Sequence, residues 1–183
     1  MIKEMLICLA LTNMNGVVNE HNVCSNVELI SELSEKHKID SHLFVSIMWA
    51  ESRFKGEAKS NGGACGITQV LPKYTRPRVD CEDLKNPKVG IYYGYKTFSK
   101  FYNQYAKGDV DTSLCAYNAG FRCKDEELTE KEKLVVARAR KYYIPTIKKF
   151  NRRLKRKTRK LRKQYTATID FINKFILKND QGV

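Results

Sequence analysis

Apolar residues recur at steps of three and four along most of this chain, which predicts a mainly helical protein. The clearest case is residues 41–51, where four apolar positions and one acid share a face: Leu43, Phe44, Ile47, Met48 and Glu51. Asp40 or Ser41 is a suitable N-cap, because a side-chain oxygen there can accept a bond from the first free backbone amides. The pattern therefore predicts a buried helix that ends in a carboxylic acid.

The same periodicity predicts further helices over residues 25–38, 87–106, 110–118, 134–149 and 151–177. Ser25 and Glu28 have the spacing of a capping box at the start of the first of these. Pro145 predicts a kink or a break, since proline removes a backbone donor inside a helix. No stretch indicates a strand, so we expect a mainly α fold with at most a small hairpin after the glycines at 62–66.

The predicted helices divide the chain into a domain at 25–150 and flanking segments at 1–24 and 151–183. The first segment contains an apolar run at 5–11, far shorter than the roughly 20 residues of a membrane span. It is either a weak signal peptide or an N-terminal helix packed on the domain. The last segment is predicted to be a basic amphipathic helix with the apolar stripe Leu154, Leu161, Tyr165, Ile169, Ile172 and Ile176.

Glu51 is the first candidate for chemistry, because it lies on the apolar face of its helix. Burial disfavours an ionised carboxylate, so the pKa of Glu51 should rise and its proton should remain near neutral pH. A protonated carboxyl group is what a general acid requires. The alternative is a glutamate at a helix end that turns toward water.

A glycine-rich turn follows this helix. Gly62, Gly63 and Gly66 allow a backbone to approach a ligand closely. Gln69 offers both a hydrogen-bond donor and an acceptor, which suits the hydroxyl and acetamido groups of sugars. The turn therefore makes a carbohydrate site beside Glu51 plausible.

Several short motifs occur in one order along the chain. They are Glu51-Ser52, the run from Gly63 to Gln69, Pro72, Asn86-Pro87, Tyr117-Asn118-Ala119-Gly120 and Tyr143-Ile144. In this order they resemble the lytic transglycosylases of the soluble-lytic-transglycosylase (SLT) type, over about residues 27–150. The resemblance implies a lysozyme-like helical domain of the goose type.

The resemblance also implies an activity, which is cleavage of the β-1,4 bond between N-acetylmuramic acid and N-acetylglucosamine in peptidoglycan. Glu51 would act alone as acid and then base, and the product would carry a 1,6-anhydromuramic acid end. The residues that match the family's substrate-binding positions are Ser60, Gln69, Tyr117, Asn118 and Tyr143. No metal and no cofactor is implied. This chain has Thr68 and Leu71 at positions where methionine is common in the family, and Arg140 in the region where an acid or threonine is frequent before the tyrosine.

Two other functions are open. A hydrolytic lysozyme on the same fold would need a second carboxylate, for which Glu57 and Asp83 are the candidates. A non-catalytic module that only binds the cell wall or another polyanion is the other alternative. In each case we expect the protein to act at the bacterial cell wall, in the periplasm or envelope, as part of a bacteriophage particle, a lysis protein or a secretion or conjugation apparatus.

The net charge of +14 is concentrated in one tract. Residues 148–163 contain eleven Lys or Arg and no acid. Such a tract binds an anionic envelope polymer, a membrane surface or nucleic acid through its charge. The alternative is a solvated helix face that aids solubility.

Six cysteines are present, and none forms a CxxC pair. The three histidines do not have metal-binding spacing with them, so a zinc site is not expected. Disulfides are expected outside the cytoplasm, where Cys65–Cys81 and Cys115–Cys123 would each close a loop beside the cleft. Buried free thiols are the alternative.

Overall fold

A computed structural model describes residues 2–179, with the side chains of residues 2–168. Its α-helices are α1 (Ile2–Thr12), α2 (His21–Cys24), α3 (Val27–His37), α4 (Ser41–Ser52), α5 (Cys81–Lys85), α6 (Pro87–Ser99), α7 (Val110–Ala119), α8 (Glu130–Arg138) and α9 (Ile144–Asn179). Short 3₁₀ segments occur at Pro72–Tyr74 and Gly120–Lys124, and π-helical segments at Lys100–Tyr105 and Ala139–Tyr143. Over the described residues the only β pairing is two isolated bridges, Lys59 with Cys65 and Cys65 with Val70. The prediction of a mainly α fold is confirmed.

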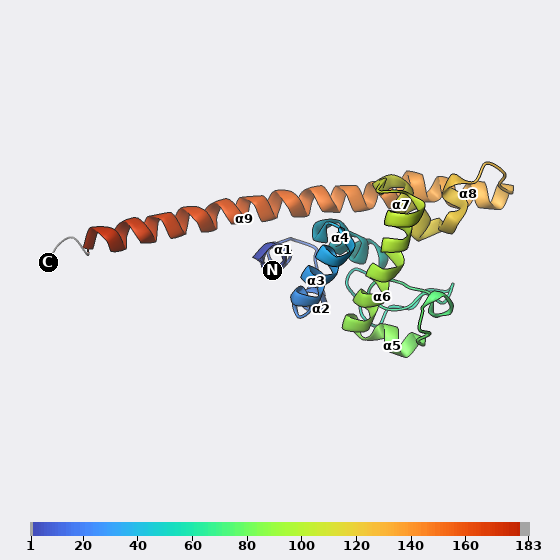
Figure 1. Cartoon of the computed structure of the whole chain (residues 1–183), viewed down its shortest axis with the longest axis horizontal. Coiled ribbons are helices and arrows are strands. Elements are labelled where there is room, and N and C mark those ends of the chain that lie inside the picture. The colour runs from blue at the N-terminus through green and yellow to red at the C-terminus, as the bar shows by residue number, and fades with distance from the viewer. Residues whose placement is uncertain (1, 180–183) are drawn as a thin grey trace.

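Helix α4 lies at the centre of the domain (Figure 1). Asp40, one of the two expected candidates, is its N-cap, and its side chain accepts a hydrogen bond from the backbone amide of His42 at 3.2 Å. Helix α4 has buried apolar residues on more than one face: Val45 is as inaccessible to solvent as Phe44 and Ile47. A helix enclosed in this way holds its last turn rigidly, and Glu51 lies in that turn.

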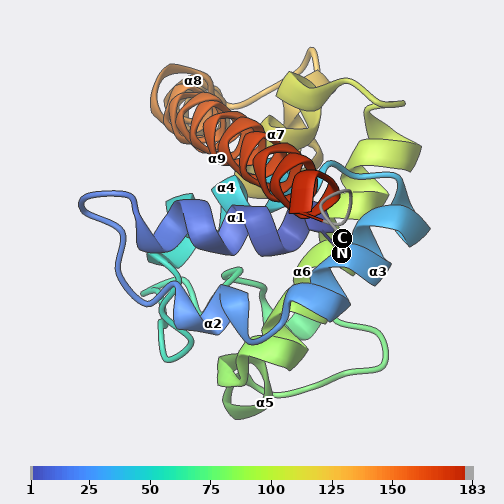
Figure 2. The same ribbon diagram turned by 90° about the vertical axis from the view of Figure 1, so that its left-hand side faces the viewer.

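Helix α9 packs across α4 and α1 and then projects beyond the domain (Figures 1 and 2). Ile147, Phe150 and Leu154 are buried against these helices. The prediction of a separate helix starting at 151 is wrong, because α9 runs unbroken from Ile144. A kink or a break was predicted at Pro145, which lies in the first turn of α9. The structure has no break there, but the π-helical segment Ala139–Tyr143 departs from regular α-helix just before it.

Helix α1 is packed on the domain, which is the second of the two structures expected for the N-terminal segment. Ile7, Ala10 and Leu11 are buried, and a disulfide joins Cys8 to Cys24 of α2. Met1 and residues 180–183, which complete the predicted terminal segments, lie outside the described residues. The same holds for the side chains of Ile169, Ile172 and Ile176.

The capping box predicted at Ser25 and Glu28 is wrong. The N-cap of α3 is Asn26, whose side chain makes no capping hydrogen bond. The Ser25 hydroxyl instead donates to the backbone carbonyl of His21 in the preceding helix. The local pattern failed here because α2 ends immediately before α3, so that Ser25 is the C-cap of α2 and not the N-cap of α3.

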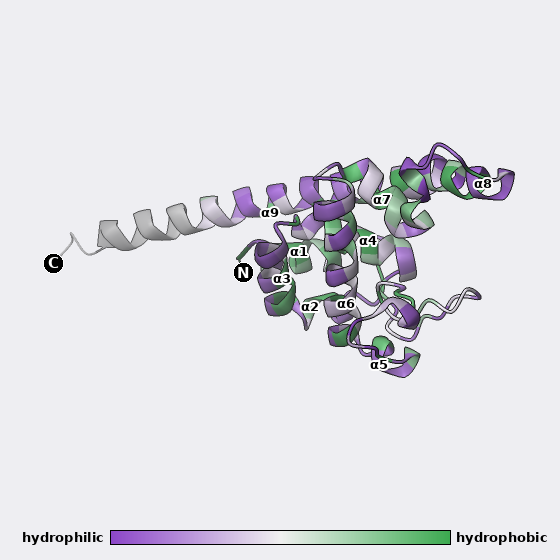
Figure 3. Cartoon of the chain, turned by 45° about the vertical axis from the view of Figure 1, so that its right-hand side comes forward, coloured by the Kyte–Doolittle hydropathy of each residue, from purple (hydrophilic) through white to green (hydrophobic). Residues whose placement is uncertain are grey.

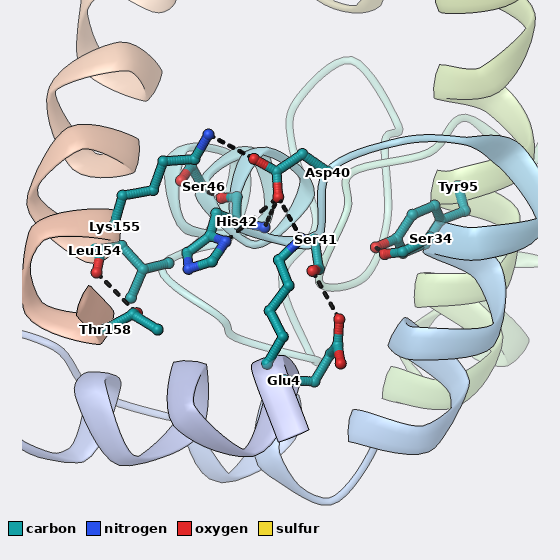
Figure 4. Close-up of polar contacts among 11 residues, drawn as sticks. Glu4, Ser34, Asp40, Ser41, His42, Ser46, Tyr95, Leu154, Lys155 and Thr158 are labelled. Atoms are coloured by element: carbon teal, nitrogen blue, oxygen red, sulfur yellow. Dashed lines mark hydrogen bonds and ion pairs between the residues drawn. The ribbon is translucent and has the colours of Figure 1, made fainter. Parts of the chain in front are cut away.

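A polar cluster ties the first turn of α4 to α1 and α9 (Figure 4). The Asp40 carboxylate pairs with Nζ of Lys3 at 2.8 Å and with Nζ of Lys155 at 2.6 Å. Ser41 donates to Oε1 of Glu4 at 2.8 Å. Burial alone would raise the pKa of Asp40, but hydrogen bonds from His42 and both lysines hold that pKa well below its usual range.

Hydrophobic residues gather where the helices pack on one another, while the coloured part of α9 that leaves the domain is mainly hydrophilic and α8 carries residues of both kinds (Figure 3). Among the described residues, no helix combines the length and the apolar character needed to cross a membrane.

Candidate functional site

Glu51 is partly buried, and it lies in the last turn of α4. The Tyr143 hydroxyl donates a hydrogen bond to Oε1 of Glu51. Tyr143 comes from the π-helical segment that precedes α9. Two distant parts of the chain therefore fix the orientation of one carboxyl group.

Burial raises the pKa of Glu51 to about 7, and the hydrogen bond from Tyr143 partly opposes this rise. Burial favours the protonated form because it removes water from around the charge, whereas a donor stabilises the ionised form. A carboxyl group with a pKa near 7 can give up a proton and take one back at neutral pH. This agrees with the direction expected from the apolar face on which Glu51 lies.

Tyr117, in α7, is the second phenol near this carboxyl group. Its hydroxyl donates to the backbone carbonyl of Thr68 at 2.8 Å, and its ring packs edge-on against Phe98 at 5.7 Å between centroids. Burial, followed by the negative charge of Glu51, raises the pKa of Tyr117 well above its usual value. Tyr143 is affected by the same two causes. Both phenols therefore stay protonated beside Glu51.

The glycine-rich turn is held against α4 and α6 by close backbone contacts. The Ser52 hydroxyl donates to the carbonyl of Ile67 at 2.8 Å, which links the turn to the residue after Glu51. Gly66 has a positive φ of 77°, and a Cβ there would lie 1.9 Å from the Leu84 carbonyl oxygen. At Gly94, a Cβ would lie 2.5 Å from the Thr68 side chain. Glycine at both positions lets the turn approach the neighbouring helices.

Two disulfides close loops beside the site, as the cysteine positions suggested. Cys65 in the turn is bonded to Cys81, and Cys115 in α7 is bonded to Cys123. No cysteine is free among the described residues. Such bonding is expected of a protein that works outside a reducing cytoplasm.

Gln69 and Ser60 have structural roles in the turn. The Gln69 amide donates to the carbonyls of Ala58 at 3.1 Å and Gly66 at 3.0 Å, so its donor hydrogens are used within the protein. The Ser60 hydroxyl accepts from the backbone amide of Ala64 at 3.0 Å. Gln69 is in the wall of the cleft described next, whereas Ser60 lies on the exposed loop.

A cleft of about 800 Å³ lies between the glycine-rich turn, α6 and the end of α7. Of the residues predicted to bind substrate, Gln69, Tyr117 and Asn118 line this cleft, and Asn118 is exposed. Glu51 and Tyr143 are not in its wall. Tyr117 links the cleft to the pair Glu51 and Tyr143, because it lines the cleft and its pKa is raised by the negative charge of Glu51.

Other cleft residues were not found from the sequence, because distant segments bring them together. They include Tyr74, Arg76, Lys100, Phe101, Phe121 and Arg122. The rings of Phe101 and Phe121 pack at 5.2 Å between centroids, and Phe121 is 62% exposed. Its position directly after the Tyr117–Gly120 motif was the one signal that could have indicated it. An exposed ring at this edge can stack on a sugar.

The other acids near the turn in sequence are engaged elsewhere. Asp80 and Asp83 form the reciprocal capping box of α5. Glu82 pairs with Lys85 at 2.8 Å, and the side chain of Glu57 is 85% exposed. Glu57 and Asp83 do not line the cleft, and neither contributes to the pKa of Glu51.

Asp125 and Glu132 line the cleft, and Glu132 pairs there with Arg122 at 2.9 Å. Among the described residues, no other acid contributes to the raised pKa of Glu51, so its partner is Tyr143 rather than a second carboxyl group.

Comparisons with known proteins identify a family for this chain and a solved structure with a similar fold. Residues 28–136 match the family described as the transglycosylase SLT domain. The fold is similar to that of a lytic transglycosylase, Slt from Pseudomonas aeruginosa, whose X-ray structure is of an inactive mutant with glutamine in place of a glutamate. The TM-score is 0.50 at 22% identity, and the match covers 67% of this chain but 24% of the Pseudomonas chain. This chain thus spans about a quarter of that relative, and the likeness concerns the fold.

Proposed function

We propose, from the premise that this chain belongs to the transglycosylase SLT domain family, that it cleaves peptidoglycan glycan strands as a lytic transglycosylase. The bond cleaved would be the β-1,4 linkage from N-acetylmuramic acid to N-acetylglucosamine. The family accounts for the general activity, which is peptidoglycan cleavage. The reaction type and the residues that perform it are the proposal.

The observation that carries this proposal is the Glu51 carboxyl group, whose pKa is raised to about 7 beside Tyr143. At neutral pH a large fraction of such a group is protonated, so it can donate to a glycosidic oxygen. The inactive mutant of Slt carries glutamine in place of one glutamate. An inactive variant of that protein with this one replacement is consistent with the same assignment here.

The mechanism needs one carboxyl group acting twice. Glu51 donates its proton to the bridging oxygen, the bond from C1 of N-acetylmuramic acid breaks, and the leaving sugar departs with a free hydroxyl. The acetamido group of the substrate stabilises the positive charge at C1. Glu51, now ionised, removes the proton of the C6 hydroxyl, whose oxygen bonds to C1 and closes the 1,6-anhydro ring. Atoms balance without water.

The surroundings of Glu51 support this path over hydrolysis, because no other acid among the described residues contributes to its raised pKa. Glycosidases that use water or a covalent intermediate place two carboxyl groups across the bond. Here Asp80 and Asp83 cap a helix, and Glu57 points to solvent. Tyr143 would hold Glu51 in place, and Tyr117 and Asn118 would bind sugar in the cleft.

The expected site of action is the bacterial cell wall, and three disulfides are compatible with an extracytoplasmic location. We assign catalysis to the segment 25–150 and leave the projecting part of α9 outside it. Ser60 and Gln69 would act mainly by shaping the turn, since their polar groups are engaged within the protein.

The experiment that tests this function is release of dye from labelled peptidoglycan by the wild type, Glu51→Gln and Glu57→Gln. Glu51→Gln keeps the shape of the side chain but cannot donate a proton, so we expect a loss of 10²–10⁴-fold. Glu57→Gln removes an exposed acid of the same type and should retain nearly full activity. Equal losses in the two variants would contradict the assignment of Glu51.

A further inference from the structure

The outer side of α9 carries a basic ridge, which we define as the eleven Lys and Arg of residues 148–163. Ten of these side chains are exposed, and Lys157 is partly buried. The buried residues of the same segment, Phe150, Leu154 and Thr158, face the domain. The central line of the ridge follows the steps i, i+4, i+7 and i+11 through Arg152, Arg156, Arg159 and Lys163. This line lies on the side of α9 opposite Leu154.

The charge of the ridge is largely uncompensated within the described residues. Lys148 pairs with Asp111 at 2.7 Å and Lys155 with Asp40 at 2.6 Å. Arg153 donates to the backbone carbonyl of Asn15 at 2.9 Å, which leaves its charge unpaired. No other acid is paired with the ridge among the described residues.

The ridge is unfavourable to the helix that bears it. Like charges four residues apart destabilise a helix, and such pairs recur here, as between Arg152 and Arg156 or Arg159 and Lys163. The repulsion is relieved when a polyanion covers the ridge. Sixteen residues of helix give a contact about 24 Å long.

The shape of the ridge disfavours nucleic acid. A major groove about 12 Å wide takes in much of a helix about 10–12 Å across, so a helix that enters it stands out from the domain that carries it. Here α1 and α4 cover the inner side of α9. Single strands need aromatic rings on which bases stack, and the one aromatic residue of the tract, Phe150, is buried against Trp49 at 4.3 Å between centroids.

A flat anionic surface needs only the outer side of the helix. Tyr142, in the turn before α9, is 60% exposed, whereas Tyr165, equally exposed, continues the line of Leu154 and Leu161 on the other side of the helix. Tyrosine is favoured at the boundary between lipid and water because it combines an apolar ring with a polar tip. Lys and Arg place their charges at phosphate level through long apolar stems.

We propose that the basic ridge docks this protein on a bilayer that contains anionic phospholipid. The cleft stays open in that arrangement, because no residue of α9 lines it. The choice of a membrane rests on the proposed function, since an enzyme of the cell wall works beside a bilayer. Docking would hold the cleft near membrane-proximal glycan strands.

The test is flotation of the full chain with vesicles of phosphatidylcholine alone or with about one third phosphatidylglycerol, at low and high salt. The ridge variant replaces Arg152, Arg156, Arg159 and Lys163 with Gln. A matched control removes four exposed lysines elsewhere, Lys36, Lys88, Lys107 and Lys131, also by Gln. Both variants have the same net charge.

We expect the wild type to float with anionic vesicles and to be released by high salt. The ridge variant should bind on the order of 100-fold more weakly, while the control should change by a few-fold. The proposal would be overturned if the wild type did not bind anionic vesicles, or if both variants bound them equally more weakly than the wild type. Tighter binding to a duplex DNA oligonucleotide than to the vesicles would assign the ridge to nucleic acid instead.

Peptidoglycan digestion by the ridge variant separates this inference from the proposed function. The variant should digest isolated peptidoglycan at the wild-type rate, because the ridge is remote from the cleft wall. If the protein binds anionic vesicles but digests no peptidoglycan, the proposed membrane docking stands and the proposed transglycosylase activity is contradicted. Since vesicle binding by the wild type and its salt dependence need no variant, a folding defect in the ridge variant would leave the test intact.

Discussion

The Tyr143 hydroxyl donates a hydrogen bond to the Glu51 carboxyl group, although 92 positions separate the two residues along the chain. Glu51 lies in the last turn of the central helix α4, and Tyr143 lies immediately before α9, which packs on α4. The packing of α9 on α4 therefore positions the hydroxyl group that orients the carboxyl group.

The stability of the protein should fall between about pH 4.5 and pH 7 because of Glu51. Its pKa is raised to about 7 in the folded state, so the folded state binds a proton that the unfolded state has already released in this range. The stabilisation is fully present below the unfolded pKa and is lost as the pH rises through the folded one. We expect a change of about 1–3 kcal/mol, measured by urea unfolding across this range. Glu51→Gln should abolish this slope, and a variant that kept it would contradict the raised pKa.

Tyr143→Phe should raise the pKa of Glu51 further, since the lost hydrogen bond stabilises the ionised form. The alkaline limb of the pH profile of kcat/KM should move to higher pH. The rate should fall roughly 100-fold, because the carboxyl group loses its orientation. Tyr117→Phe is the comparison, since that hydroxyl bonds to the Thr68 carbonyl and not to Glu51. Identical shifts of the limb in the two variants would show that the Tyr143 bond is not the cause.

Gly66→Ala should destabilise the fold by about 3 kcal/mol or more, because the new Cβ would lie 1.9 Å from the Leu84 carbonyl oxygen. Gly63→Ala is the matched control, since Gly63 has a similar positive φ but no atom within 4 Å of the Cβ position. There the cost should be about 1–2 kcal/mol, from backbone strain alone. Thermal unfolding distinguishes the two, and equal losses would remove the role assigned to close packing of the turn.

Leu154→Ala should destabilise the domain by about 2–5 kcal/mol, as expected for a fully buried leucine. Leu161, seven residues further along α9, is only partly buried, and its replacement by Ala should cost at most about 1 kcal/mol. Urea unfolding measures both. A small effect at Leu154 would mean that residues beyond 150 form an appendage, as the predicted domain boundary has it.

Features that depend on neighbouring residues were predictable from the sequence. The buried helix that ends at Glu51 and its cap at Asp40 follow from local periodicity and local hydrogen bonding. The departure from regular α-helix just before Pro145 follows from the chemistry of one residue. In each case the determining contacts lie within four residues along the chain.

Features that join distant segments were not predictable in this way. Asp40 draws Lys3 and Lys155 together from opposite ends of the chain, and no local pattern indicates either ion pair. The hydroxyl of Tyr117 finds a backbone carbonyl at Thr68, and any residue at 68 would supply the same acceptor. The unbroken course of α9 past residue 150 depends on the surface that α1 and α4 offer to Leu154. Such contacts become visible only when the fold is known.

The most direct test of the central claim is mass spectrometry of the fragments that the protein releases from purified peptidoglycan, with Glu51→Gln as the comparison. The proposed reaction uses no water, so the muramic acid end of each fragment should be lighter than a hydrolytic product by one water, and the variant should release none. Reducing ends of full mass, released by the wild type, would contradict the transglycosylase and would require a second carboxyl group that positions water.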